Sequence, residues 1–513
     1  MNKSSSDSKA DLLASVVVFL VALPLCMGIA IASGVPPARG LLTGIIGGII
    51  TGRLAGCPLQ VSGPAAGLAV LVYELVQAYG IGWLGVVVLG AGVLQWLAGR
   101  CGLGRAFQAV SPAVVKGMLA GIGVLIFASQ FHVLVDDKPR GDGLANLLSI
   151  PEAIAKGLLP ADDSAHHLAA LIGLFTLSLI LIWENFRPKK LELVPAPLVA
   201  VTGATLLAAV SGWPVSKVVV PTALGDFFAL PQASLLSTFT PAILGSMLAV
   251  AFIASAETLL SATAVDAMHD GPRADYNQEL KAQGVGNMLC GLLGGLPMTG
   301  VIVRSTANIK AGARTRNSAI FHGIWLGALV FMVPGLLALI PTAALAAILV
   351  YIGVKLVDLK VIASLRQFSR WEVSIYLVTL CTIVAFDLLT GVIAGLALSV
   401  FRVILSLAHL DVRVDTDSYG NSQVTFRGAA TFLSLPKLSA ALEGLERGKE
   451  VSLHIDGLMY LDHACKESLE EFARLYERQG GNVHLEWQRL ATLSREKRLK
   501  LHAGESDHRS EVA

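Results

Sequence analysis

The chain has 513 residues, of which 54% are hydrophobic and 15% are charged, and its mean hydropathy is +0.67. Soluble domains average about 25% charged residues, so this composition excludes an ordinary soluble protein and indicates a polytopic membrane protein. The net charge is only +2, and we expect no nucleic-acid partner. The six cysteines are scattered without metal-binding spacing. The sequence contains no phosphate-cradling loop and no recognisable nucleophile–base pair, so we expect neither an enzyme nor a cofactor.

A polar N-terminus, residues 1–10, precedes a long region of recurring apolar runs, residues 11–410. The first run is longer than the apolar core of a signal peptide, which spans about 7–15 residues, and many more runs follow it. It therefore predicts a first transmembrane helix. The predicted transmembrane segments are 12–33, 40–53, 64–79, 82–99, 110–135, 166–183, 196–212, 241–265, 278–296, 301–311, 318–339, 341–356, 371–386 and 388–409.

Two of these fourteen segments are short, and glycine and proline interrupt their starts. They begin at Pro64 and Val301, and each is the third segment of its half of the chain. An odd number of spans per repeat inverts the second copy in the membrane, so the pattern predicts a seven-plus-seven inverted repeat. Paired interrupted segments are typical of a transporter's binding site. The alternative is that glycine and proline are simply commoner in membrane helices.

The distribution of basic residues predicts the topology. With the N-terminus inside, the main basic clusters fall in cytoplasmic loops, near Arg100, Arg187, Lys310 and Lys355. Cytoplasmic loops of membrane proteins are enriched in lysine and arginine. We therefore expect the N-terminus and the C-terminal domain in the cytoplasm. The membrane we expect is a bacterial-type cytoplasmic (inner) membrane.

The composition changes near residue 410, and residues 411–495 are polar. Alternation in "QVTFRG" and "VSLHIDG" predicts strands, and helical periodicity follows in "LPKLSAALEGL" and "ACKESLEEFARLYERQ". The order strand–helix–strand–helix–strand, ending in "NVHLEW", predicts a small α/β domain. Residues 496–513 are predicted to form a disordered tail.

The two interrupted segments share one local pattern. Leu59–Ser62 is predicted to be extended and to enter a helix near Pro64, and Leu296–Thr299 is predicted to be extended before Gly300 and a second helix. Two helix N-termini would then face each other, each with unpaired N–H groups and about half a positive charge. Such ends bind anions. The predicted anion-contacting residues are Ser62, Gly63, Ala65, Ala66, Thr299, Gly300, Val301, Ile302 and Arg304.

Two ionisable residues lie inside apolar runs. Arg304, about one turn into the second half-helix, would add a full positive charge beside the anion. Glu257 is its expected counter-charge, either at the site or as a purely structural ion pair. Ser261 lies one turn along on the same face, so the two could ligate Na⁺; alternatively, Glu257 carries a proton. A solvated cytoplasmic loop is expected to hold Asp266, His269, Arg273, Asp275 and Glu279.

Several motifs resemble the SulP (sulfate permease, solute carrier family 26) signature. They are "LVALPLCMGIAIASGVPPARGLLTG", "QVSGPAAG", "NQELKAQGVGNMLCGLLGGLPMTGVIVRS" and "AGARTRNSAIFHG". The segments "VTFRGAATFLSLPKLSAAL" and "HIDGLMYLDHACKESL" resemble a STAS domain. The resemblance covers residues 11–490 and implies core and gate domains, a homodimer, and elevator-type movement of an anion held between half-helices three and ten. The anion-site arginine of the family corresponds to Arg304, and its helix-eight carboxylate corresponds to Glu257.

Two departures from the family pattern bear on coupling and regulation. Proton-coupled relatives carry a carboxylate in the first helix, where this chain has Leu25 and Cys26 after Pro24. This resembles the bicarbonate-type branch, which includes Na⁺-coupled members, although the helix-eight acid here is Glu rather than Asp. In the STAS-like domain, no serine or threonine follows Asp462 directly, so we expect no phosphoswitch there.

The sequence therefore predicts a secondary active transporter of small inorganic anions, with bicarbonate favoured over sulfate and dicarboxylates. Na⁺ is favoured as the coupling ion over H⁺ or simple exchange. One rival is a nucleobase transporter of the same fold, against which Arg304 argues. The other is a membrane-anchored signalling protein whose output is the STAS-like domain.

Overall fold

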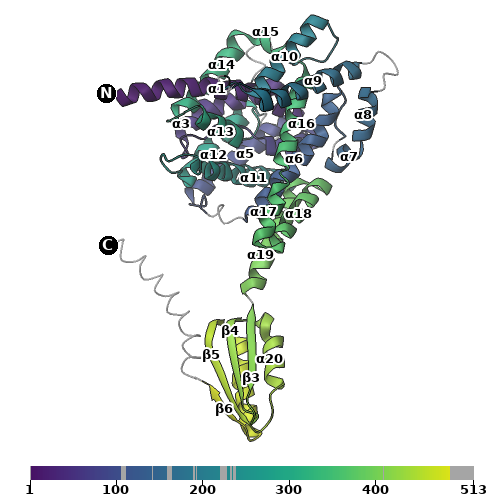
Figure 1. Cartoon of the computed structure of the whole chain (residues 1–513). Coiled ribbons are helices and arrows are strands. Elements are labelled where there is room, and N and C mark those ends of the chain that lie inside the picture. Colours follow the sequence, from purple (N-terminus) through teal and green to yellow (C-terminus); the bar gives the residue numbers. More distant parts are fainter. Residues whose placement is uncertain are drawn as a thin grey trace. The chain divides into compact units, whose positions relative to one another are not determined.

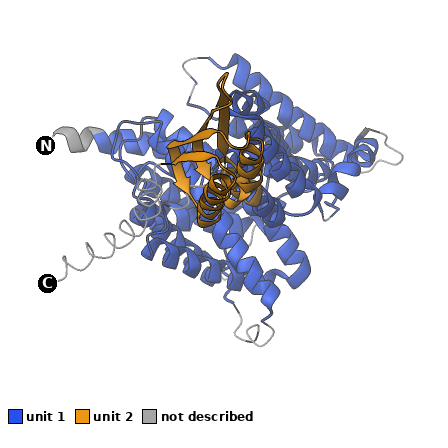
Figure 2. Ribbon diagram, turned by 90° about the horizontal axis from the view of Figure 1, so that it is seen from below, with its two compact units in different colours: residues 1–396 blue, residues 397–513 orange. Residues whose placement is uncertain are grey.

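A computed structural model of the chain describes residues 2–105, 111–140, 142–158, 165–188, 191, 193–219, 228–231, 234, 239–407 and 409–485. It divides into two compact units, residues 1–396 and 397–513 (Figures 1 and 2). The first unit consists mainly of helices, and the second contains a four-stranded sheet. The predicted fold class, a helical polytopic membrane protein with a small α/β domain, is confirmed.

The elements up to the unit boundary are mostly apolar helices. They are α1 (Asn2–Ala32), α2 (Pro37–Ile46), η1 (Gly47–Thr51), α3 (Gly52–Leu54), β1 (Ser62–Pro64), η2 (Ala66–Leu68), α4 (Ala69–Tyr79), α5 (Ile81–Arg100), α6 (Pro112–Leu134), α7 (Gly143–Leu148), α8 (Ile150–Leu158), α9 (Ala165–Phe186), α10 (Ala196–Ser211), α11 (Pro241–Asp266), α12 (Tyr276–Leu293), β2 (Met298–Gly300), α13 (Ile302–Lys310), α14 (Asn317–Met332), α15 (Pro334–Leu337), α16 (Thr342–Leu356), α17 (Lys360–Phe368), α18 (Arg370–Ala385) and α19 (Leu388–Leu407).

Each of the fourteen predicted segments coincides with one or more of these helices. In the described part of the chain, six helices are long and apolar enough to cross a membrane alone: α1, α5, α6, α9, α11 and α19. The others are shorter. The helices α4 and α13 are short because each follows an extended break, β1 or β2, that takes up part of the span. The helix α2 continues through the π-helical turn η1 into α3.

The helices of the first unit pack in two groups. In one group, α5 packs on α4, α11 and α12, and α1 packs on α2, α13 and α14. In the other, α6 packs between α16 and α18, and α9 packs on α10. The groups meet where α1 packs on α16. Glycines lie where the backbones of neighbouring helices come closest together. A Cβ on Gly92 of α5 would lie 2.7 Å from the carbonyl oxygen of Gly284 on α12. A Cβ on Gly123 of α6 would lie 2.6 Å from the carbonyl oxygen of Gly353 on α16. Small residues at such crossings are typical of membrane helices.

The second unit holds β3 (Leu410–Thr416), β4 (Ser422–Ala430), α20 (Leu435–Glu443), β5 (Glu450–Leu461), α21 (His463–Arg478) and β6 (Asn482–Leu485). The strands are ordered β3-β4-β5-β6, with β3 antiparallel to β4 and the other neighbours parallel. Apolar residues of the strands and of both helices form its core, including Val424, Phe426, Leu453 and Leu469.

The order strand–helix–strand–helix–strand is confirmed for β4 to β6, but the prediction missed β3. This strand follows directly on the last apolar helix, and its alternation of Leu410, Val412 and Val414 is the signal that identifies it. The predicted disordered tail, residues 496–513, lies outside the described residues, as do residues 486–495 of the predicted domain.

Candidate functional site

The two interrupted segments meet in a short antiparallel ladder. Ser62 of β1 lies opposite Gly300 of β2, and Gly63 lies opposite Thr299. The helical turn η2 and then α4 follow β1, whereas α13 follows β2. Two helix N-termini therefore start from this one ladder, as the sequence predicts. Antiparallel pairing is also what an inverted repeat requires, because its second copy runs in the opposite direction.

Buried side chains satisfy the extended backbone of the first break. Asn308 Nδ2 donates to the carbonyl oxygen of Leu59 at 3.0 Å, and the Val61 N–H donates to Ser305 Oγ at 2.9 Å. The Val301 N–H donates to the Val61 carbonyl oxygen at 2.9 Å. Non-helical backbone is tolerated at membrane depth only where protein or a cavity satisfies it. The helix α13 supplies that support here.

The second break is supported in the same way. Asn287 of α12 accepts from the Met298 N–H at 2.7 Å and donates to the Met298 carbonyl oxygen at 2.9 Å. The Gly300 N–H donates to Thr258 Oγ1 at 3.1 Å, and Ser261 Oγ donates to the Gly300 carbonyl oxygen at 2.7 Å. Both Thr258 and Ser261 lie on α11. The predicted cation ligand Ser261 thus already positions the ladder, and its ligand role stays a prediction.

The helix α12 carries a buried polar stripe that the sequence analysis overlooked. Glu279, Gln283 and Asn287 are spaced four residues apart and are fully buried, so they share one face. Glu279 Oε2 accepts from the Cys57 N–H at 2.9 Å, and Gln283 Nε2 donates to Ser62 Oγ at 2.6 Å. The expectation that Glu279 lies in a solvated loop is wrong, because its carboxylate holds the loop that leads to β1. The polar i, i+4, i+8 spacing in an apolar helix is the signal for this role.

Arg304 is fully buried on the first turn of α13. Its guanidinium lies against the backbone of Gly63, where an added Cβ would come within 1.9 Å of Nη1. Nη2 donates to the Cys26 sulfur at 3.3 Å, whereas Nε and Nη1 have no hydrogen-bond partner. A guanidinium has five N–H donors, and leaving a buried donor unpaired costs free energy. These nitrogens are therefore available to a ligand.

Glu257 does not pair with Arg304. Glu257 is half-buried on α11, but its carboxylate oxygen Oε2 is buried. The carboxylate faces the Gly67 N–H and the Thr299 hydroxyl, and a Cβ on Gly67 would lie 3.0 Å from Oε2. Both Oε2 and Thr299 Oγ1 have no hydrogen-bond partner. The prediction that Glu257 and Arg304 form an ion pair is therefore wrong. The guanidinium lies over Gly63, whereas the carboxylate lies four residues further along the chain, at Gly67.

The N-terminal ends of η2 and α13 are not capped by side chains. Of the predicted anion-contacting residues, those of the ladder and Ala65 and Arg304 are buried, whereas Ala66, Val301 and Ile302 are only half-buried. Uncapped N–H groups, small side chains and one unsatisfied guanidinium make this ladder a candidate site for a small anion. Two unpartnered oxygens, Glu257 Oε2 and Thr299 Oγ1, add hard acceptors that suit a hydrogen-bond donor or Na⁺.

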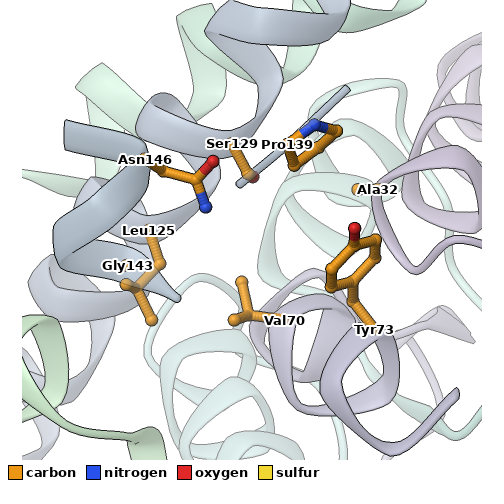
Figure 3. Close-up of a pocket in the computed structure, with 8 residues that line it drawn as sticks. All are labelled: Ala32, Val70, Tyr73, Leu125, Ser129, Pro139, Gly143 and Asn146. Carbon is orange, nitrogen blue, oxygen red and sulfur yellow. The ribbon is translucent and has the colours of Figure 1, made fainter. Parts of the chain in front are cut away.

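A small pocket lies between the two helix groups. It is lined from the first group by Ala32 of α1 and by Val70 and Tyr73 of α4, and from the second by α6, by α7 and by Pro139 in the segment that precedes α7 (Figure 3). Its remaining lining residues are Leu125, Ser129, Gly143 and Asn146. None of them is a predicted anion-contacting residue, so the pocket marks incomplete packing between the groups rather than the site itself.

Comparison with known proteins places this architecture among anion transporters. The sequence model of the sulfate permease family matches residues 9–379. The putative sulfate transporter YvdB of Bacillus subtilis (strain 168) is 29% identical over 493 residues, covering 92% of this chain and 90% of that protein. The bicarbonate transporter BicA of Picosynechococcus sp. is 24% identical over 437 residues, covering 81% of this chain and 74% of that protein. The inward-facing murine anion transporter Slc26a9 has a similar fold, with a TM-score of 0.77 at 16% sequence identity. The match covers 92% of this chain and 84% of that protein.

Proposed function

Since the chain belongs to the sulfate permease family of membrane anion transporters, we propose that it carries bicarbonate by secondary active transport coupled to Na⁺. The anion binds between the N-terminal ends of η2 and α13, beside Arg304. It moves with the first helix group, in an elevator-type motion against the second. The observation that carries the proposal is the pair of unsatisfied groups at one ladder, a cationic donor on Arg304 and an anionic acceptor on Glu257.

Before a coupling cation binds, the charges of the protein at the site favour a monoanion. Arg304 contributes one positive charge, and each helix N-terminus adds the equivalent of about half a charge. The carboxylate of Glu257 faces the same ladder. Subtracting its charge leaves roughly one positive charge for the ligand to neutralise. A dianion such as sulfate would exceed this charge by one unless the coupling Na⁺ or a proton were bound as well, so the count favours a monoanion only for the site without its cation.

Hydrogen-bonding capacity favours bicarbonate further. Its oxygens can accept from Arg304 and from the backbone N–H groups, and its O–H can donate to Glu257 Oε2. Sulfate at neutral pH has no donor to offer this oxygen, and a buried acceptor left unpaired costs free energy. The name of the relative YvdB keeps sulfate as the second candidate substrate.

Na⁺ coupling rests on the oxygens of α11 and β2. A carboxylate and a hydroxyl, from Glu257 and Thr299, are free to ligate a hard cation, and Ser261 Oγ lies at the same ladder. The first helix offers no carboxylate as a proton carrier after Pro24. We further propose a homodimer in a bacterial-type cytoplasmic membrane, with the N-terminus and a STAS-like second unit in the cytoplasm.

Uptake by purified protein in liposomes tests the substrate. We expect accumulation of radiolabelled bicarbonate that depends on Na⁺ and that excess unlabelled sulfate inhibits weakly. Rapid sulfate uptake without bicarbonate uptake would make sulfate the substrate. No uptake of bicarbonate, sulfate or dicarboxylates would contradict the proposal and favour the rival, a signalling protein.

A further inference from the structure

Cys26 occupies a position on α1 that no anion-binding argument requires. It is fully buried, and its sulfur accepts the one hydrogen bond made by the guanidinium of Arg304, from Nη2 at 3.3 Å. The other two guanidinium nitrogens, Nε and Nη1, are unpartnered. Arg304 itself is 0% exposed.

The guanidinium is held from two sides. Gly63 of β1 lies so close to Nη1 that a Cβ there would come within 1.9 Å of it. This contact restricts movement toward the ladder but does not set the direction in which the nitrogens point. The Cys26 sulfur holds Nη2, and because the guanidinium is planar, this hydrogen bond and the Gly63 contact together restrict where Nε and Nη1 point.

The sulfur itself has little freedom. A Cβ on Gly44 of α2 would lie 2.7 Å from the Cys26 sulfur, and a Cβ on Gly40 would lie 2.0 Å from the Cys26 carbonyl oxygen. The helix α2 therefore packs directly on the backbone and thiol of Cys26. Close packing on this scale holds a side chain in one rotamer.

We propose that Cys26 is a positioning residue for the transported anion. Its sulfur binds Nη2 of Arg304 and so directs Nε and Nη1 toward the ligand. This inference rests on the proposed role of Arg304 in anion binding. It predicts that Cys26 affects the concentration of anion needed for half-maximal uptake, KM, rather than the maximal rate.

The test compares variants of Cys26 in the full-length protein in liposomes, with bicarbonate as the probe. Cys26→Ala and Cys26→Val both remove the acceptor, the first with a smaller side chain and the second with a larger one, and we expect both to raise KM about threefold to tenfold. Cys26→Ser supplies a stronger acceptor and should restore KM to near the wild-type value. Cys290→Ala is the matched control, because Cys290 is an equally buried free thiol on α12.

The outcomes separate this inference from the proposed function. Wild-type KM in Cys26→Ala and Cys26→Val would overturn it, although transport itself would stand. An equal rise of KM in Cys26→Ser, or in Cys290→Ala, would also overturn it, because loss of packing alone would then explain the effect. If the wild-type protein moved no anion, the proposed function would fail, and the inference would fail with it.

Discussion

Arg304 places a guanidinium in an apolar segment, where its surroundings satisfy only part of its hydrogen-bonding capacity. The guanidinium is buried against Gly63 and bonds only to the Cys26 sulfur. A charge buried in a membrane protein is costly and typically marks a functional site. The absence of an ion pair with Glu257 strengthens that reading, since a purely structural arginine would be expected to have its counter-charge in contact.

Replacing Arg304 tests whether its guanidinium contacts the transported anion. Arg304→Ala should lower anion uptake at least about tenfold, because a hydrogen bond to a charged group contributes about 1.5–3 kcal/mol. Uptake in liposomes is the measurement, and gel filtration checks that the protein is folded. Arg100→Ala, which removes an exposed arginine at the end of α5, is the control. Normal uptake by Arg304→Ala would show that the anion binds elsewhere.

Glu257 carries the prediction on coupling. Glu257→Gln keeps the size of the side chain but removes the charge, so uptake should no longer depend on Na⁺. Rates are compared in Na⁺ and in choline at one pH, with Glu184→Gln as the control, since Glu184 bonds to Lys355 away from the site. Wild-type rates that do not change in choline but rise with an inward proton gradient would assign Glu257 a proton instead.

At the scale of elements, the extended breaks β1 and β2 could be predicted from the sequence, but the buried side chains that hydrogen-bond to them could not. Glycine and proline at the start of two short apolar runs identify β1 and β2 from sequence alone. Their pairing joins segments more than 230 residues apart, which local patterns do not reveal. The stripe of Glu279, Gln283 and Asn287 was visible as spacing, but its partners are backbone groups of distant segments. Likewise, opposite charges on neighbouring helices suggested an ion pair that side-chain directions do not allow.

Asn287 tests the role of α12 as a support. Asn287→Ala leaves the N–H and the carbonyl oxygen of Met298 without their side-chain partner. Each buried polar group left unpaired costs about 1–3 kcal/mol. We expect a lower apparent melting temperature in detergent and slower uptake. Asn185→Ala, at an exposed asparagine on α9, should change neither. Equal melting temperatures for the two variants would show that β2 does not depend on α12.

The helix α21 of the second unit allows a chemical test of its packing. Burial, together with the hydrogen bond and the charge of Asp462, raises the pKa of the Cys465 thiol to about 12. The thiol is therefore protonated at pH 8, and only the thiolate reacts quickly. Alkylation followed by mass spectrometry should modify exposed Cys101 at least about tenfold faster than Cys465 in the native protein. Equal rates would contradict the packing of α21 on the sheet.

At the scale of the whole molecule, the candidate site lies entirely within the first unit. The ladder, Arg304 and Glu257 belong to β1, β2, α13 and α11, all of which precede residue 397. The elements that support the ladder belong to the same helix group. The ladder and its supports are therefore confined to one of the two helix groups. The second unit has a hydrophobic core of its own, formed by its strands and by α20 and α21.

Truncation after His409, ahead of β3, follows from this separation. We expect the shortened protein to fold and to bind bicarbonate with nearly the wild-type affinity, because no residue of the site is removed. A lower transport rate or a less stable dimer would not contradict the location of the site in the first unit. Binding is measured as the rise in melting temperature with added bicarbonate, since a ligand that binds only the folded state stabilises it. The truncated Arg304→Ala protein is the control and should show no rise. If the truncated protein were folded but gained no stability from bicarbonate, while the full-length protein did, the second unit would have to contribute to the site.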